Sequence, residues 1–497
     1  MNDLRQTVLL RRFLIYLAAF IVFIIFVSFL YSQSNFLAKF FGLHQDDFST
    51  ALKETLLLQN YNSRIVLVGV MTLGLTGGII GSFMLLRKRS LMSDAISHAT
   101  LPGLCLAFLL MTIFSDSDGK SLIGLLIGAA ISAIVGMLCM LILKKYSRLK
   151  EDSILGIILS VFFGAGIALM GVIQNHSKAF PNASAAGLEN FILGKSASLH
   201  MDQVYMLLIA AIVVFLVSLL LYKEFKLLCF DQDFCGVQGM SVIFLDLILM
   251  ALIVGVTVIG LKTVGIIMVI AMLIIPAAAA RFWTEKLSTM IIIAAIIGGL
   301  SGYIGATLSA IIDKMPTGPT IVLSCSCCFI LSMFFGLKRG LLIRYYKQYK
   351  LSKKVSRQNL LRAIYEWFEA NPQAEKEGKG ISFKQLLELR SWSEYALAAE
   401  VYNASKVGLI ANTLDTNWHL TELGKAEASL IVRNHRLWEI YLITHADIAT
   451  SRVDRETDAI EHVLGVRMVN ELEKIVARDF PHVDVPPSPH PISIGRV

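Results

Sequence analysis

A carboxylate and an imidazole stand one helical turn apart in an apolar stretch of the chain. Asp94 and His98 are four residues apart, so they share one face of a helix predicted over 91–113. Together they make half of a site for Mn²⁺, Fe²⁺ or Zn²⁺. Pro102 has no N–H, which frees the carbonyl oxygen of His98. The structural alternative is that Asp94 caps the helix while His98 bonds to a neighbouring helix. Ionisable groups inside a membrane span are costly and usually functional, which favours the metal site.

A second set of ligand-type side chains lies near the C-terminus. Its members fall on two predicted helix faces. On the first, two residues are at positions i and i+4, and on the second, four residues are at positions i, i+4, i+7 and i+8. The first face carries His435 and Glu439, and the second carries Asp454, Asp458, Glu461 and His462. Six such side chains can clamp one or two divalent cations. The same spacing is also typical of a solvated charged face, and both interpretations stay open on spacing alone.

Most of the elements that position these residues are apolar. The chain is 55% hydrophobic and only 16% charged, whereas soluble proteins are about 25% charged. A membrane span needs about 20 apolar residues, and about ten such runs occur before residue 338. They cover 13–30, 64–86, 91–113, 121–143, 153–173, 204–222, 241–260, 263–283, 288–311 and 319–337. The sequence therefore predicts an all-α polytopic membrane protein with about ten spans, followed by a soluble part.

Charge is distributed so that it orients these spans. Residues 1–350 carry 27 basic and 17 acidic side chains, and residues 351–497 carry 18 and 20. The basic excess gathers at alternate turns, which we expect to be cytoplasmic together with both ends of the membrane part. These turns contain Arg11–Arg12, Arg87–Arg89, Lys144–Lys150, Lys223–Lys226 and Lys338–Arg339. The pI of 9.0 therefore reflects membrane turns rather than a nucleic-acid surface, and the basic stretch 338–362 suits anionic lipid.

Several unusual strings in the membrane part occur in one characteristic order. The run 91–103 comes first, and the last is Pro316–Thr320. Between them lie Glu151–Gly156, Tyr222–Gly239 and Thr263–Ala277. Over about 60–337 the chain resembles the metal-type ABC permeases, the zinc, manganese and iron importers. The resemblance implies a permease in the bacterial cytoplasmic (inner) membrane that carries a divalent ion inward.

The resemblance also implies partners and roles. Such permeases pair with a second copy or a sibling, bind two cytoplasmic ATPase subunits, and receive the ion from an extracytoplasmic metal-binding protein. It assigns Asp94 and His98 to the translocation path. It assigns Phe230, Asp231 and Gly239 to a coupling segment that docks on the ATPase, although a simple structural turn would also explain that segment. No GxxxxGK[ST] phosphate loop occurs. We therefore expect no enzyme activity and no permease cofactor, with ATP hydrolysed by another subunit.

The soluble part reads as a winged helix followed by a helical domain. We expect helices over 358–370, 381–389 and 392–407, a wing over 408–424, and a long helix that Thr421 caps. The third helix would be the one that enters a DNA groove. It brings two Glu and one Lys, whereas DNA affinity rests largely on Lys and Arg, so DNA is a doubtful partner.

Residues 356–491 resemble the iron- and manganese-dependent repressors of the diphtheria-toxin-repressor family. The resemblance places one metal site on Asp458, Glu461 and His462, and a second on His435, Glu439 and Asp454. A further ligand of the family falls on Asn359, a weak metal ligand. The same divalent ion is then both substrate and ligand of this tail. Which metal it is stays open among Mn²⁺, Fe²⁺ and Zn²⁺, with a lean toward manganese or iron.

The expected organisation has five parts. They are an N-terminal helix with an outer polar segment (1–59), the permease core (60–337), a basic linker (338–357), the winged-helix part (358–424) and the metal-binding and dimerisation part (425–497). The tail is expected in the cytoplasm. Two hypotheses for it remain: it senses metal and gates transport, or it is a metal-dependent repressor, tethered or released by proteolysis. A proton-driven carrier without an ATPase is a third, weaker possibility for the whole chain.

Overall fold

The chain forms two compact units, which divide between Ile343 and Arg344. The structure is a computed structural model, and the predicted run 13–30 lies outside the residues that it describes. The described residues are 60–87, 89–114, 121–175, 199–312, 315–377, 379–390, 392–412 and 417–445, with 471, 472, 474 and 478.

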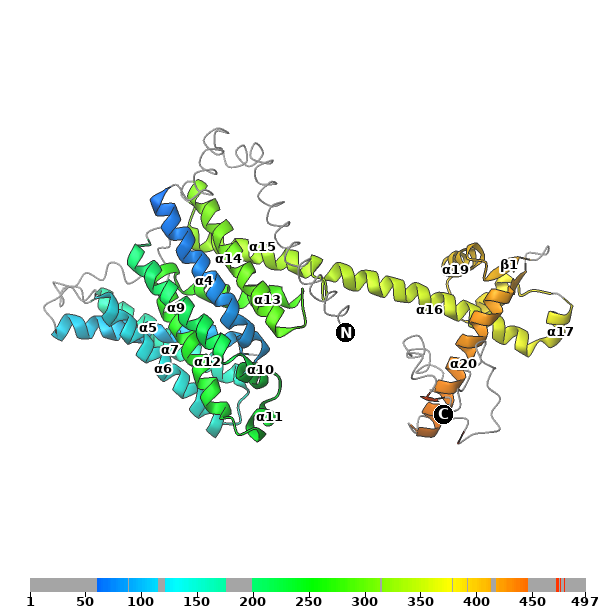
Figure 1. Cartoon of the computed structure of the whole chain (residues 1–497), viewed down its shortest axis with the longest axis horizontal. Coiled ribbons are helices and arrows are strands. Elements are labelled where there is room, and N and C mark those ends of the chain that lie inside the picture. Colours follow the sequence, from blue (N-terminus) through cyan, green and yellow to red (C-terminus); the bar gives the residue numbers. More distant parts are fainter. Residues whose placement is uncertain are drawn as a thin grey trace. The chain divides into compact units, whose positions relative to one another are not determined.

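The first unit is a bundle of long apolar helices (Figure 1). Each of the nine predicted runs within the described residues forms one helix. They are α4 (Tyr61–Leu86), α5 (Ser90–Phe114), α6 (Leu122–Tyr146), α7 (Glu151–Asn175), α9 (Met201–Leu220), α12 (Val242–Val264), α13 (Ile266–Arg281), α14 (Leu287–Ile311) and α15 (Thr317–Phe335). Eight of these are long and apolar enough to cross a membrane. Helix α13 has 16 residues, or about 24 Å at 1.5 Å per residue, and is shorter than a full span. The all-α membrane architecture is confirmed, while the count of ten spans stays a prediction.

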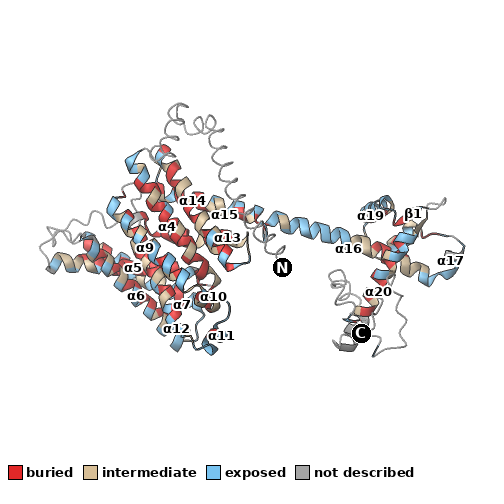
Figure 2. Cartoon of the chain, viewed as in Figure 1, coloured by how far each residue is buried: buried red, intermediate tan, exposed pale blue. Residues whose placement is uncertain are grey.

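Helix α4 lies at the centre of one half of the bundle, against α9, α13 and α14. Its crossing with α14 depends on small residues, because a Cβ added to Gly74 would lie 2.2 Å from the carbonyl oxygen of Gly298. The same holds one turn later, where Gly78 meets the carbonyl of Ala294 at 2.3 Å. Close backbone approach of this kind replaces the hydrophobic drive that is absent between helices in lipid. Figure 2 shows buried positions along much of α4.

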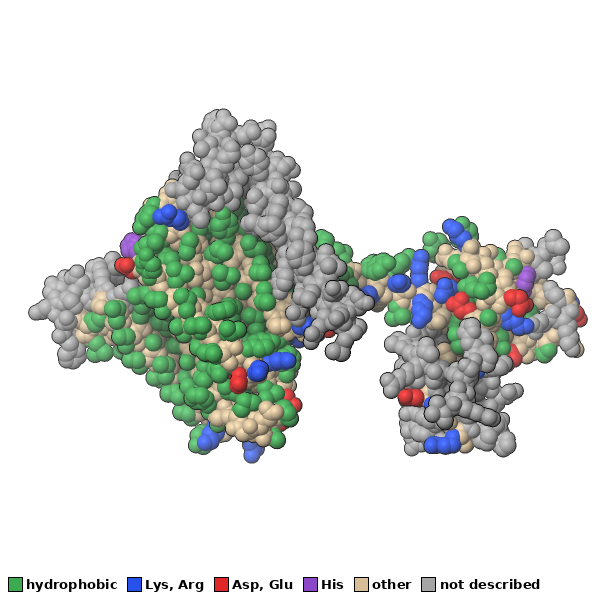
Figure 3. Space-filling view, in the orientation of Figure 1, with side chains coloured by type: hydrophobic (Ala, Val, Ile, Leu, Met, Phe, Trp, Pro, Cys, Tyr) green, Lys and Arg blue, Asp and Glu red, His purple; other side chains and the backbone are tan. Residues whose placement is uncertain are grey.

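The other half of the bundle is formed by α5 with α6 and α7. Apolar side chains cover the face of the bundle that Figure 3 presents, as expected of a surface in contact with lipid tails. Between α9 and α12 the chain forms two short helices, α10 (Tyr222–Phe230) and α11 (Gln232–Val237). Gly239 follows with a φ of 80°, a backbone conformation that glycine adopts without strain.

The second unit contains mainly helices and one small antiparallel hairpin. Its elements are α16 (Leu341–Ala370, which begins just before the division), α17 (Pro372–Lys376), α18 (Phe383–Leu389), α19 (Glu394–Lys406), β1 (Ile410–Asn412), β2 (Trp418–Leu420) and α20 (Glu422–His445). The two strands pair with Ile410 opposite Leu420 and Asn412 opposite Trp418. The predicted order of three helices, a hairpin and a long helix is therefore present, with the short helix α17 added between the first two.

Local signals in the sequence explain where these helices begin. Ser382 and Gln385 form a capping box at the start of α18, and the Ser393 hydroxyl accepts a hydrogen bond at the start of α19. The hydroxyl oxygen of Thr421 accepts from the Gly424 N–H at 3.1 Å, so the expected cap of the long helix is present. The segment expected as a basic linker lies mostly within α16, which continues without a break into the first helix of the expected winged-helix part.

Candidate functional site

Helix α5 holds Asp94 and His98 side by side. The Nε2 atom of His98 lies 3.3 Å from Oδ1 of Asp94. Two ligands of one cation, each about 2.0–2.2 Å from it at tetrahedral or octahedral angles, stand about 2.8–3.6 Å apart. The pair therefore has the spacing of two adjacent ligands of one ion. Helix α5 begins at Ser90, so Asp94 lies a full turn inside it, and the alternative in which Asp94 caps this helix does not hold.

The imidazole of His98 is positioned from the side by helix α7. Its ring meets that of Phe163 edge to face, with centroids 4.8 Å apart and planes at 77°. Its Nδ1 atom is buried and has no hydrogen-bond partner among the described residues. Pro102 lies inside α5, one turn after His98, where it removes the N–H that would bond to the His98 carbonyl. The aromatic contact thus orients a ring whose polar atoms are little used by the fold.

The face of α5 that carries the pair is only partly covered. The side chains of Asp94 and His98 are 32% and 21% exposed, and Leu91, about one turn before Asp94 on this face, is exposed. Within the described part of the chain, no group of three or more His, Cys, Asp or Glu side chains is placed to hold a metal. The pair therefore needs ligands from elsewhere, because transition-metal sites in proteins have four or more.

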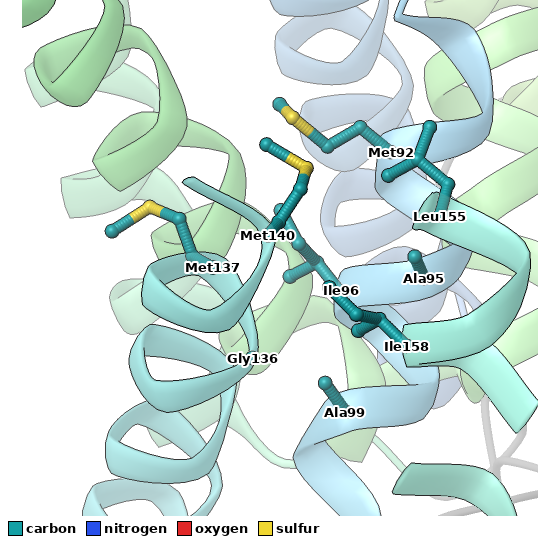
Figure 4. Close-up of a pocket in the computed structure, with 9 residues that line it drawn as sticks. All are labelled: Met92, Ala95, Ile96, Ala99, Gly136, Met137, Met140, Leu155 and Ile158. Atoms are coloured by element: carbon teal, nitrogen blue, oxygen red, sulfur yellow. The ribbon is translucent and has the colours of Figure 1, made fainter. Parts of the chain in front are cut away.

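A cavity opens on another face of α5, where that helix meets α6 and α7 (Figure 4). Its lining is apolar and contains neither Asp94 nor His98. The residues are Met92, Ala95, Ile96, Ala99, Gly136, Met137, Met140, Leu155 and Ile158. Such a lining suits side-chain packing rather than a hydrated cation. The ligand pair and this cavity are therefore separate features of α5.

A buried ion cluster lies at the end of the bundle where α4 ends and α5 begins. Arg87 Nη2 lies 2.8 Å from Asp246 Oδ1, and Arg89 Nη1 lies 2.7 Å from Asp246 Oδ2. The three residues are only 8%, 6% and 8% exposed. Arg87 and Arg89 belong to a turn that the charge distribution predicts to be cytoplasmic, and within that turn both are buried and paired. The sequence did carry the signal for Asp246, a lone acid inside the apolar run 241–260.

The expected coupling segment forms a small knob outside the bundle. Asp231 begins α11 by accepting a hydrogen bond from the Phe234 N–H at 2.9 Å, which confirms the expected cap. Phe230, Phe234 and Val237 are exposed, Val237 to 83%. Cys235 is buried and anchors the underside of the short helix. The segment therefore presents apolar side chains outward, as a surface that packs into a partner does.

In the tail, the structure describes the side chain of one predicted sensor ligand. His435 on α20 is buried, and its Nδ1 atom is 2.9 Å from Nη1 of Arg362 on α16. Arg362 also donates to Glu366 at 2.6 Å. The Oδ1 atom of Asn359 is buried without a partner among the described residues. Glu439 lies in α20 with its side chain undescribed, and Asp454, Asp458, Glu461 and His462 lie outside the described residues.

The outer face of α19 differs from that of a DNA-reading helix. Tyr395, Tyr402 and Glu394 are exposed on it, and Lys406 is its only basic residue. Glu400 faces inward, where burial raises the pKa of its carboxyl while Lys353 and Arg357 act in the opposite direction. The helix has a single basic side chain, whereas a phosphate backbone is bound chiefly by Lys and Arg.

Comparison with known families divides the chain as the structure does. Residues 59–336 match the family described as "ABC 3 transport family". Residues 421–492 match the family described as "Iron dependent repressor, metal binding and dimerisation domain". The first match includes Asp94, His98 and the α10–α11 segment, and the second covers all six predicted sensor ligands.

Individual relatives and one solved structure agree with these matches. The "Manganese transport system membrane protein MntC" of Bacillus subtilis (strain 168) is 38% identical over 399 residues, which covers 80% of this chain and 88% of that relative. The "Zinc transport system membrane protein TroC" of Treponema pallidum (strain Nichols) is 40% identical over 296 residues, covering 60% and 96%. The structure "PsaBC from Streptococcus pneumoniae in complex with Fab" is similar with a TM-score of 0.50 at 27% identity, covering 60% of this chain and 99% of that chain.

Proposed function

The chain belongs to the ABC 3 transport family, and from that premise we propose that it is the membrane permease of an ATP-driven importer for a divalent transition-metal ion. The observation that carries the proposal is the Asp94–His98 pair on α5, with its two ligand atoms 3.3 Å apart. A carboxylate and an imidazole in a membrane span are expensive unless they serve a cation or a proton. Their spacing suits a cation better than a structural role.

The ion passes between two permease chains. Each chain supplies two ligands from a face that its own helices leave partly open. A second chain that covers this face brings a second carboxylate and imidazole, which completes a set of four ligands. It also removes the cost of leaving Asp94 against lipid. A mixed set of two carboxylates and two imidazoles suits Mn²⁺ or Fe²⁺ as well as Zn²⁺, and the two relatives above are named for manganese and zinc.

ATP hydrolysis reaches the permease through the α10–α11 segment. Its exposed Phe230, Phe234 and Val237 would fill an apolar groove on an ATPase subunit, and Gly239 sets the turn that returns the chain to α12. The short helix is apolar on its outer side and is anchored by the buried Cys235 on its inner side. This asymmetry supports a segment that docks on an ATPase subunit rather than a turn that only connects two spans. An extracytoplasmic metal-binding protein would deliver the ion to the opposite end of the bundle.

The tail binds the transported ion and gates transport. Its match to a metal-binding and dimerisation domain supports a sensor, and the single basic residue of α19 favours gating over repression. Reciprocal linkage requires that metal on the tail favours one transporter state by as much as that state favours metal. Inhibition by accumulated metal is the sign expected of feedback. The second candidate, a metal-dependent repressor, rests on the hairpin and helix order of this unit.

The test is metal uptake by proteoliposomes that contain the full chain and its ATPase subunits. We expect Mn²⁺, Fe²⁺ or Zn²⁺ to accumulate only with ATP, and the ATPase subunits to co-purify with the permease. Val237→Asp, which places a charge on the most exposed apolar side chain of the knob, should abolish co-purification. The matched control is Val407→Asp, the same substitution at an exposed valine outside the membrane spans. Uptake that persists without ATP would favour a carrier of another class.

A further inference from the structure

We infer that Asp246, with Arg87 and Arg89, links the coupling segment mechanically to the helix that bears Asp94 and His98. We call these three residues the charge link. They are positioning residues, because none of them touches the proposed ion. The inference rests on the proposed function, since it assigns the α10–α11 segment to the ATPase and α5 to the ion.

The charge link joins three elements at one buried point. One carboxylate, on the second turn of α12, receives a guanidinium on each oxygen, at 2.8 Å from Arg87 and 2.7 Å from Arg89. Charge-assisted hydrogen bonds are strong and directional, and more so where water is excluded. All three residues are buried, so Asp246 cannot exchange either arginine for water without a large change in the surrounding packing.

On one side the link reaches the coupling segment. Arg87 Nη1 donates to the carbonyl oxygen of Leu228 at 3.0 Å, two residues before α10 ends. The same part of α10 is held to α4 by the ring of Phe225, which meets Phe83 edge to face with centroids 5.3 Å apart. A displacement of α10 therefore acts directly on Arg87.

On the other side the link reaches the ligand pair. The carbonyl of Arg89 accepts a hydrogen bond from the Met92 N–H at 3.0 Å, so this arginine is the first anchored residue of α5. Asp94 and His98 follow on the same continuous helix. Because a helix moves as one body over a few turns, a shift of Arg89 by its partner Asp246 moves the two ligand side chains with it.

The charges explain why two arginines are present rather than one. A single Arg–Asp pair would connect α12 to one neighbour, whereas the shared carboxylate makes both arginines move with α12. The net charge of the trio is one positive, and Glu151 at the start of α7 lies 4.0 Å from Arg89. Lys144 at the end of α6 also bonds to Glu151. Glu151 is therefore shared between Arg89 and Lys144, and the five side chains together keep one positive charge.

The competing explanation is that the cluster only stabilises the fold. The two explanations differ in the coupling ratio, the number of ions taken up per ATP hydrolysed. We would reconstitute the full chain with its ATPase subunits and measure Mn²⁺ taken up per ATP hydrolysed. Asp246→Asn keeps the shape and removes the charge, and Asp246→Glu keeps the charge. The control is Glu285→Gln. The Glu285–Arg339 pair also joins a carboxylate to a guanidinium, but its atoms are 3.9 Å apart and both side chains are exposed.

We expect the uptake per ATP to fall at least five-fold in Asp246→Asn while ATP hydrolysis changes less than two-fold. Asp246→Glu should recover at least half of the wild-type ratio, and Glu285→Gln should equal wild type. An unchanged ratio in Asp246→Asn would overturn the inference. If neither Asp246→Asn nor the milder Arg89→Gln assembles with the ATPase, the cluster serves folding and the inference is equally overturned.

Hydrogen exchange on the same complexes gives a readout that needs no transport. In wild type, ATP should change amide protection in 223–239 and in 89–98 together. In Asp246→Asn the change should remain in 223–239 and be lost from 89–98. If ATP changes amide protection in both segments of the wild type but no metal is taken up, the proposed function is wrong while the charge link is supported. If ATP still changes amide protection in both segments of Asp246→Asn, the charge link is wrong while the proposed function is unaffected.

Discussion

At the scale of single residues, spacing predicted which side chains lie together but not which charged side chains are buried. The four-residue separation of Asp94 and His98 predicts a shared helix face, and the structure places their ligand atoms 3.3 Å apart. The burial of Arg87 and Arg89 could not be predicted in the same way, because arginines at a turn between two spans normally face water. Asp246, far along the chain, pairs with both arginines inside the bundle. A lone acid in an apolar run is the signal to look for in such sequences.

Arg362 gives the tail a resident cation next to a predicted metal ligand. A guanidinium only donates hydrogen bonds, so Nδ1 of His435 must accept at 2.9 Å. The proton of the neutral ring is then on Nε2, and neither nitrogen has a lone pair free for a metal. Metal binding by His435 therefore requires that Arg362 move away.

We therefore expect Arg362→Met to strengthen Mn²⁺ binding by the tail about ten-fold, in the range by which groups around metal ligands change affinity. Equilibrium binding on the full chain would measure this, with Asp94→Ala and His98→Ala included to silence the membrane pair. The matched control is Arg436→Met, because Arg436 also joins α20 to α16, through Glu369. Equal affinity of the Arg362→Met and control chains would contradict the competition.

At the scale of elements, apolar run length predicted the helices well. Backbone polar groups in lipid must be satisfied within the helix, so each described run forms one helix with ends near those expected. Which helices pack together was not predictable. The α4–α14 crossing depends on a glycine in each helix at the same point, Gly74 and Gly298, and their match in space is not visible in either run alone.

In the tail the local caps were predictable and the helix lengths were less so. Ser393 and Thr421 begin their helices because each supplies an acceptor for an unpaired N–H. The segment 338–357, which the sequence predicts to link the membrane part to the tail, is helical from Leu341. Residues such as Lys, Leu, Arg and Gln favour a helix when nothing interrupts them.

At the scale of the whole molecule, the chain joins a transporter to a domain that resembles a regulator. If the tail gates transport, metal on its side of the membrane inhibits uptake by the full chain. A chain that lacks 351–497 should then transport at a rate that no longer falls as this metal rises. Uptake by vesicles preloaded with Mn²⁺ measures the difference. Equal inhibition of the full and shortened chains would exclude gating and favour the repressor.

The central claim is that the Asp94–His98 pair passes a dipositive ion across the membrane. The most direct test is ATP-driven Mn²⁺ uptake by the chain that carries both Asp94→Ala and His98→Ala, beside Thr112→Ala as a control on the same helix. We predict that the double variant assembles with the ATPase and loses at least ten-fold in uptake, while Thr112→Ala keeps the wild-type rate. Uptake by the double variant at the wild-type rate would contradict the account.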